Sequence, residues 1–283
     1  MLDRATDAGY GRAMARPSDR FVRLPGLRFH YLDWGSPGAP PVLMLHGGAQ
    51  TAHSFDEVAP ALAAHHHVMC LDQRGHGDTG WASRYRREDF GADVAALLDA
   101  LGWDAAALVG MSLGGLNAIA FAAAEPARVR ALVVVDVVPS VAPAGRDAIA
   151  KQLAVHEFAS FDDAVASAHA FNPRRTIENI RERLRHAMHE GPDGRWRYKY
   201  DPGIGAGASE LDRLWADVRR IRAPTLLVRG AESPVVTDEG VERFVRTLAG
   251  SRCVVVPGAG HSVMGDNPAG FLAAVRPFLA RHR

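Results

Sequence analysis

The residue best suited to act as a nucleophile is Ser112, in the segment Gly110-Met111-Ser112-Leu113-Gly114-Gly115. This segment follows the apolar run Ala105–Val109 and precedes a stretch of small residues, which predicts a serine on a tight strand-to-helix turn. Such a turn needs glycine neighbours, because its backbone is strained and the helix packs closely on the strand. The N-terminus of the helix would also face the negative charge that develops when serine attacks a carbonyl group.

A serine nucleophile requires a general base, and His261 is the histidine best placed to be that base. It ends the segment Val256-Pro257-Gly258-Ala259-Gly260-His261, a glycine-rich loop after the last predicted strand. In an open α/β sheet, ligands bind at the carboxyl edge of the strands, where the turn at Ser112 also opens. The triplet His65-His66-His67 lacks metal-ligand spacing and is interpreted as a solvated loop.

Backbone N–H groups for an oxyanion are predicted at two turns. The segment His46-Gly47-Gly48-Ala49 follows the apolar run 41–45, so the N–H of Gly48 can face the same crevice as the N–H of Leu113. Two converging donors would stabilise a tetrahedral intermediate. The alternative interpretation of residues 46–49 is an ordinary glycine turn.

These residues must be positioned by a layered fold. Short β-branched runs alternate with longer Ala- and Leu-rich segments, a pattern typical of βαβ units and a largely parallel sheet. The predicted strands lie near 20–24, 28–34, 41–45, 67–71, 105–109, 130–136, 224–229 and 252–256, and the predicted helices are 86–101, 113–124, 238–249 and 267–282. No convincing core strand occurs between 138 and 215. Because a structureless insert of that length is improbable, we predict a mostly helical subdomain there.

Four motifs in this order resemble the α/β-hydrolase superfamily over residues 20 to 282. They are the turn at 46–48, the segment Asp72-Gln73-Arg74-Gly75-His76-Gly77, the glycine-flanked Ser112, and the loop that ends at His261. The resemblance implies an α/β fold with an eight-stranded, mostly parallel sheet, a helical cap after the sixth strand and a nucleophile–acid–histidine triad. We accordingly expect a mobile tail at 1–19, a core at 20–137 and 216–283, and a cap at 138–215. Asp72 and Arg74 are interpreted as structural polar residues.

The acid of the triad is where this chain departs from the family pattern. Many relatives place an Asp three or four residues after a glycine that follows the seventh strand, but here Ser233 and Pro234 stand at those offsets. Three carboxylates remain: Asp136 at the end of the sixth predicted strand, Glu232, and Asp238. We favour Asp136, because a carboxylate at the end of an apolar strand is costly unless it is hydrogen-bonded. Glu232, Asp238 and a bare Ser–His dyad stay open.

The resemblance implies a serine hydrolase that cleaves an ester or a lactone. Carbon–carbon bond hydrolysis of a diketone-type substrate is the nearest alternative, and a cofactor-free oxygenase or a ligand-binding member of the fold is the next. A serine in place of aspartate disfavours the dehalogenase and epoxide hydrolase branches. The cap arginines are interpreted as a solvated helix face, with recognition of a carboxylated substrate as the alternative; they are Arg174, Arg175, Arg181, Arg183 and Arg185.

Composition limits the partners. The net charge of +1 makes nucleic acid an unexpected partner, and two cysteines favour a reducing compartment over a disulfide framework. No apolar stretch approaches the ~18 residues of a membrane span. We therefore expect a cytoplasmic protein that acts on a small molecule without a membrane partner, and a homodimer stays open. No ligand spacing for a metal and no phosphate-binding glycine motif occurs, so neither a metal nor an organic cofactor is expected.

Overall fold

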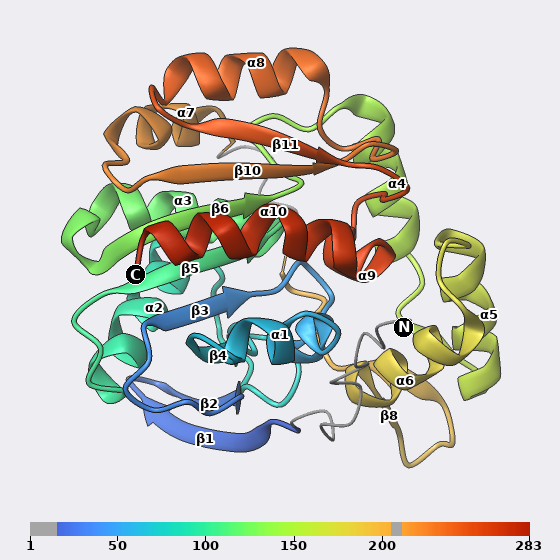
Figure 1. Ribbon diagram of the computed structural model, residues 1–283. Coiled ribbons are helices and arrows are strands. Elements are labelled where there is room, and N and C mark those ends of the chain that lie inside the picture. The colour runs from blue at the N-terminus through green and yellow to red at the C-terminus, as the bar shows by residue number, and fades with distance from the viewer. Residues whose placement is uncertain (1–15, 205–210) are drawn as a thin grey trace, which may run out of the picture.

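The computed structural model describes residues 16–204 and 211–283 (Figure 1). Its main sheet has eight strands in the order β1-β2-β4-β3-β5-β6-β10-β11, which confirms the predicted fold class. The strands are β1 (Ser18–Leu24), β2 (Leu27–Asp33), β3 (Pro41–Leu45), β4 (His67–Leu71), β5 (Ala106–Met111), β6 (Val129–Val135), β10 (Thr225–Gly230) and β11 (Arg252–Val256). Strand β2 pairs antiparallel with β1 and β4, whereas the other pairings are parallel.

Helices cover both faces of the sheet, which explains why its central strands are apolar throughout. One face packs against α2 (Arg87–Ala100), α3 (Leu113–Ala124), α7 (Leu211–Arg220) and α8 (Asp238–Thr247). The other face packs against α1 (Ala59–Ala63), α9 (Val263–Asp266) and α10 (Pro268–Arg281). In β5, every residue is buried, as expected for a strand between two helical layers.

Three helices and a small sheet form the inserted region, beyond the carboxyl ends of the parallel strands (Figure 1). The helices are α4 (Pro143–Leu153), α5 (Phe161–Phe171) and α6 (Ile177–Ala187). The sheet has the order β7-β9-β8, from β7 (Glu157–Phe158), β8 (Met188–Glu190) and β9 (Trp196–Tyr198). We did not predict this sheet, because strands of two or three residues are too short to show an alternating pattern.

The boundaries of the inserted region differ from those expected. Leu214, Trp215 and Val218 of α7 are buried in the main core, so the predicted boundary at 215 falls inside a helix of that core. On the N-terminal side, β1 begins at Ser18, two residues earlier than the predicted start of the core at 20. The mobile tail predicted at 1–19 otherwise falls on residues 1–15, which lie outside the described residues.

Backbone pairing joins the far end of the cap to the core. The N–H of Gly77 donates to the carbonyl oxygen of Lys199 at 2.7 Å, and the N–H of Asp201 donates to that of Gly75 at 2.8 Å. The hydroxyl of Tyr85 also donates to the Asp201 carboxylate at 2.5 Å. Among the described helices, none is long and apolar enough to cross a membrane.

Candidate active site

Ser112 stands on a strained turn between β5 and α3. Its φ of +50° lies in the left-handed region that non-glycine residues rarely adopt. Glycines permit this turn, because a Cβ at Gly110 would lie 2.4 Å from the Gly114 carbonyl oxygen and one at Gly114 would lie 2.2 Å from that of Leu45. The backbone therefore holds the serine side chain at the carboxyl end of β5, as the motif predicted.

The loop after β11 carries His261 to this serine. The distance from Nε2 of His261 to Oγ of Ser112 is 3.0 Å, and that from Nδ1 of His261 to Oδ2 of Asp136 is 2.7 Å. If Nδ1 carries the ring proton and donates it to the carboxylate, Nε2 is left to accept the serine proton. The three side chains thus form one hydrogen-bonded series from three separate segments.

Asp136 directly follows β6, and its carboxylate is completely buried. Its Oδ1 accepts from the N–H of Gly230 at 2.9 Å, and its Oδ2 accepts from the hydroxyl of Ser233 as well as facing His261. These donors offset the cost of burying the charge. The sequence did not reveal this contact of Ser233. Position 233 is one of the two offsets at which the family pattern led us to look for the acid, and its serine hydrogen-bonds to Asp136, the carboxylate that follows β6.

The other two candidate acids point elsewhere. Glu232 forms an ion pair with Arg174 at 2.5 Å and its side chain is 51% exposed. Asp238 forms an ion pair with Arg229 and is 90% exposed. Neither of them contacts His261 within the part of the chain that the structure describes. The favoured alternative, Asp136, is the carboxylate that lies against the histidine.

The two turns predicted to supply N–H groups lie against each other. The N–H of Gly114 donates to the carbonyl oxygen of His46 at 3.1 Å, which joins the start of α3 to the turn at 46–49. Within residues 16–204 and 211–283, the N–H groups of Gly48 and Leu113 donate no hydrogen bond. Both donors are therefore free to bind an oxyanion.

Two buried histidines shape this turn. Nδ1 of His46 lies 2.7 Å from the carbonyl oxygen of Gly47, and Nε2 accepts from the N–H of Gln73 at 3.0 Å. Burial lowers the pKa of His46, and it lowers that of His76 to about 3 with help from the adjacent His46, so both rings are neutral at pH 7. Gln73 in turn accepts from Asn117 of α3 at 2.7 Å, a link that the sequence analysis missed.

Asp72 and Arg74 make contacts within the core. The carboxylate of Asp72 accepts from the N–H groups of Ala52 at 2.6 Å and Asp78 at 2.9 Å and lies 2.7 Å from Nδ1 of His30. Arg74 binds the Asp93 carboxylate through two nitrogens, at 2.5 and 2.6 Å. The contacts match the structural interpretation of both residues.

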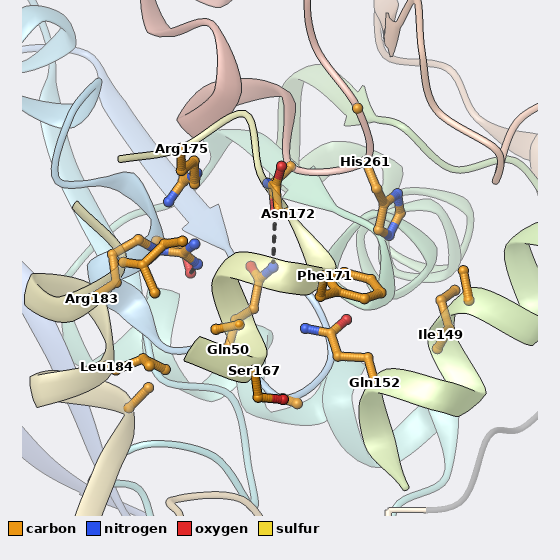
Figure 2. Close-up of a pocket in the computed structure, with 18 of the residues that line it drawn as sticks. Gln50, Ile149, Gln152, Ser167, Phe171, Asn172, Arg175, Arg183, Leu184 and His261 are labelled. Atoms are coloured by element: carbon orange, nitrogen blue, oxygen red, sulfur yellow. Dashed lines mark hydrogen bonds between the residues drawn. The ribbon is translucent and has the colours of Figure 1, made fainter. Parts of the chain in front are cut away.

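A cavity of about 530 Å³ lies between core and cap at His261. Its lining includes Phe171 of α5, Arg183 of α6, Gln152 of α4 and Gln50 of the core. Figure 2 shows Arg183 and His261 on opposite sides of this space. The volume is typical of a site for a small organic molecule.

Two groups of side chains bring possible metal ligands within 4.8 Å of one another. In one, Nδ1 of His30 lies 2.7 Å from the Asp72 carboxylate, and the Asp78 carboxylate accepts from Lys199 at 2.9 Å, so these groups already have partners. In the other, which also contains Asp56, the rings of His53 and His186 stack at 3.5 Å with an angle of 16° between their planes. Lone pairs in nearly parallel planes do not converge on one ion, so neither group is arranged for a metal.

Known proteins resemble this chain over most of its length. It is 35% identical over 258 residues to the esterase Rv0045c of Mycobacterium tuberculosis, covering 88% of this chain and 85% of that protein. It is 31% identical to the 3-hydroxybutyrate-oligomer hydrolase of Cupriavidus necator, covering 86% and 89%. The crystal structure of E-2-(acetamidomethylene)succinate hydrolase superposes with a TM-score of 0.85 at 27% identity, covering 93% and 99%. Because the model of the α/β hydrolase fold also matches residues 40–268, the chain belongs to the α/β hydrolase fold family.

Proposed function

We propose that the chain is a serine hydrolase that cleaves an ester or a lactone through an acyl-enzyme intermediate. The observation that carries this proposal is the hydrogen-bonded series from Ser112 through His261 to the buried Asp136, with distances of 3.0 and 2.7 Å. Two relatives, an esterase and a 3-hydroxybutyrate-oligomer hydrolase, support the same reaction class.

The geometry gives each atom of the series one task. Oγ of Ser112 attacks the carbonyl carbon while its proton passes to Nε2 of His261. The tetrahedral intermediate then collapses, the carbon–oxygen bond breaks, and the leaving alkoxide takes this proton. Water attacks the acyl group on Ser112 after giving a proton to the same Nε2, and collapse releases the acid and restores the serine hydroxyl. Asp136 keeps the ring in the required tautomer and stabilises the imidazolium.

The oxyanion is assigned to the N–H groups of Gly48 and Leu113. The donors become useful when the carbonyl oxygen gains charge, because neither is satisfied inside the described protein. A carbon–carbon hydrolase would use the same serine and histidine and differ in its leaving group. The experiment below therefore compares substrates of both kinds.

The test combines turnover with covalent labelling. We expect release of 4-nitrophenolate from 4-nitrophenyl butyrate, lost in Ser112→Ala but kept in the exposed control Ser83→Ala. A fluorophosphonate probe should modify Ser112 in a peptide identified by mass spectrometry. Turnover within tenfold of the parent protein in Ser112→Ala would overturn the assignment. Cleavage of a vinylogous diketone at a higher kcat/KM than any ester or lactone tested would favour the carbon–carbon alternative.

A further inference from the structure

Among the five arginines between positions 174 and 185, Arg183 alone lacks a carboxylate partner within the described residues. The four paired arginines and their partners are Arg174 with Glu232, Arg175 with Asp266, Arg181 with Asp162, and Arg185 with Glu182. Arg183 forms no ion pair within 4.0 Å across the ranges 16–204 and 211–283. The interpretation as a solvated helix face fails for Arg175, which is 5% exposed and paired, and for Arg183, which lines the cavity without a carboxylate partner in the described chain.

The surroundings of Arg183 leave its charge poorly balanced. Its single hydrogen bond among the described residues is from Nη2 to the hydroxyl of Ser54, at 3.4 Å. Burial, followed by the charge of Arg175, lowers the pKa of Arg183 to about 9, against the opposing effects of Glu57, Asp266 and Asp56. Two of these acids are already hydrogen-bonded to other side chains: Asp266 accepts from Arg175 at 3.3 Å, and Glu57 accepts from Asn179 at 2.7 Å. Arg183 is still a cation at neutral pH.

A second donor lines the same cavity. Burial raises the pKa of Tyr198 in β9 to about 12, so its hydroxyl stays protonated and can donate a hydrogen bond. The positive charge of Arg183 lowers the pKa of Tyr198, against the larger effect of burial. The guanidinium is therefore close enough to interact electrostatically with the Tyr198 hydroxyl. An anion between them would find one cationic and one neutral donor.

We propose that Arg183 binds a carboxylate carried by the substrate, on the side of the cavity opposite His261 (Figure 2). This inference rests on the proposed hydrolysis at Ser112 and narrows its substrate to esters or lactones with a free carboxylate. A neutral substrate would leave a half-buried guanidinium without a carboxylate partner, whereas a carboxylate accepts two parallel, charge-assisted hydrogen bonds from it. One unpaired guanidinium matches the single charge of a carboxylate better than the double charge of a phosphate.

The experiment compares matched substrates in matched variants. The substrates are 4-nitrophenyl monoesters of dicarboxylic acids from glutarate to pimelate, each beside its methyl-capped analogue, which lacks only the negative charge. The variants are Arg183→Gln, Arg183→Lys and the control Arg185→Gln, which removes an exposed, paired arginine from the same helix. We expect Arg183→Gln to lower the kcat/KM ratio of free acid to capped ester by about 10- to 100-fold. The ratio should change less than threefold in Arg185→Gln, and turnover of the capped esters should show that each variant is folded.

Binding without turnover separates this inference from the proposed hydrolysis. Glutarate, adipate and inorganic phosphate are titrated calorimetrically into the parent protein, Arg183→Gln and Arg183→Lys. Dicarboxylate binding that weakens at least tenfold in Arg183→Gln and is partly retained in Arg183→Lys supports the site, even where no ester is cleaved. The inference is overturned if Arg183→Gln leaves dicarboxylate binding unchanged, or if phosphate is the tighter, Arg183-dependent ligand.

Discussion

Replacing Asp136 by Asn tests the proposed triad most directly, because the structure specifies which hydrogen bonds must change. The carboxylate accepts from the N–H of Gly230 through Oδ1 and from Ser233 through Oδ2, and the same Oδ2 lies 2.7 Å from Nδ1 of His261. An amide that keeps the bond to Gly230 turns its NH₂ group toward the other two partners. The serine hydroxyl can rotate and accept, but the imidazole can accept only as the tautomer that protonates Nε2.

That tautomer cannot take the proton of Ser112, which lies 3.0 Å from Nε2. We therefore expect kcat for 4-nitrophenyl butyrate to fall by a factor of up to ~10⁴, with little change in volume at the site. Glu232→Gln and Asp238→Asn are the controls and should keep kcat within about threefold, since each acid pairs with an arginine instead of His261. A loss below tenfold in a folded Asp136→Asn protein would refute the assigned role.

A second substitution extends the same test. Ser233 and His261 meet at one carboxylate oxygen, so an Asp at position 233 would start close to Nδ1 of the ring. We expect kcat of the double variant Asp136→Asn, Ser233→Asp to be at least tenfold higher than that of Asp136→Asn. The reason is that a short charged hydrogen bond to the ring is restored. A double variant no faster than Asp136→Asn would show that position 233 cannot supply the acid.

Three other outcomes follow from the site and its supports. Ser112→Ala and His261→Ala should each lower kcat by at least ~10³, and the double variant should be little slower, as measured with 4-nitrophenyl butyrate. Gly114→Ala should lower the free energy of unfolding by roughly 3 kcal/mol in urea titrations, because its Cβ would lie 2.2 Å from the Leu45 carbonyl oxygen. Between pH 3 and 6.5, His76 is protonated in the unfolded chain but neutral in the folded chain, so the free energy of unfolding rises with pH. His76→Phe should lower the slope of this rise by about 1.4 kcal/mol per pH unit, as measured by urea titrations across this range.

Local patterns predicted the elements that hold Ser112 and His261. The glycines around the serine and the apolar strand before it are short-range features, and the structure explains them by contacts of 2.2 to 2.9 Å that any Cβ would make. The cap sheet was missed because its strands span two or three residues. The boundary at 215 was wrong because the return to the core occurs in a helix, α7, whose pattern resembles that of a cap helix.

The pairing of charges could not be derived from local patterns. Asp136 and His261 are 125 positions apart, and although the apolar strand before Asp136 favoured that residue, the motifs alone left Glu232 and Asp238 open. The same limit applies to the cap arginines. Arg174 is neutralised by Glu232 from the loop after β10, whereas Arg183, nine residues further along, meets no such carboxylate in the described chain. Both arginines line the cavity, and only the packing of cap on core determines which of them meets a carboxylate.

The contact between Ser233 and Asp136 explains how the acid can occupy different strands in one fold. Strands β6 and β10 are parallel neighbours, so Asp136 after one and Ser233 after the other end at the same edge of the sheet. Both segments therefore end near Oδ2 of Asp136, the atom that lies 2.7 Å from Nδ1 of His261. With the acid on β6, a short hydroxyl at position 233 fills the remaining space and donates to the buried carboxylate, whereas an Asp there would bring two negative charges together. The serine at position 233, which leaves the usual acid position without a carboxylate, thus donates a hydrogen bond to the carboxylate of the proposed triad.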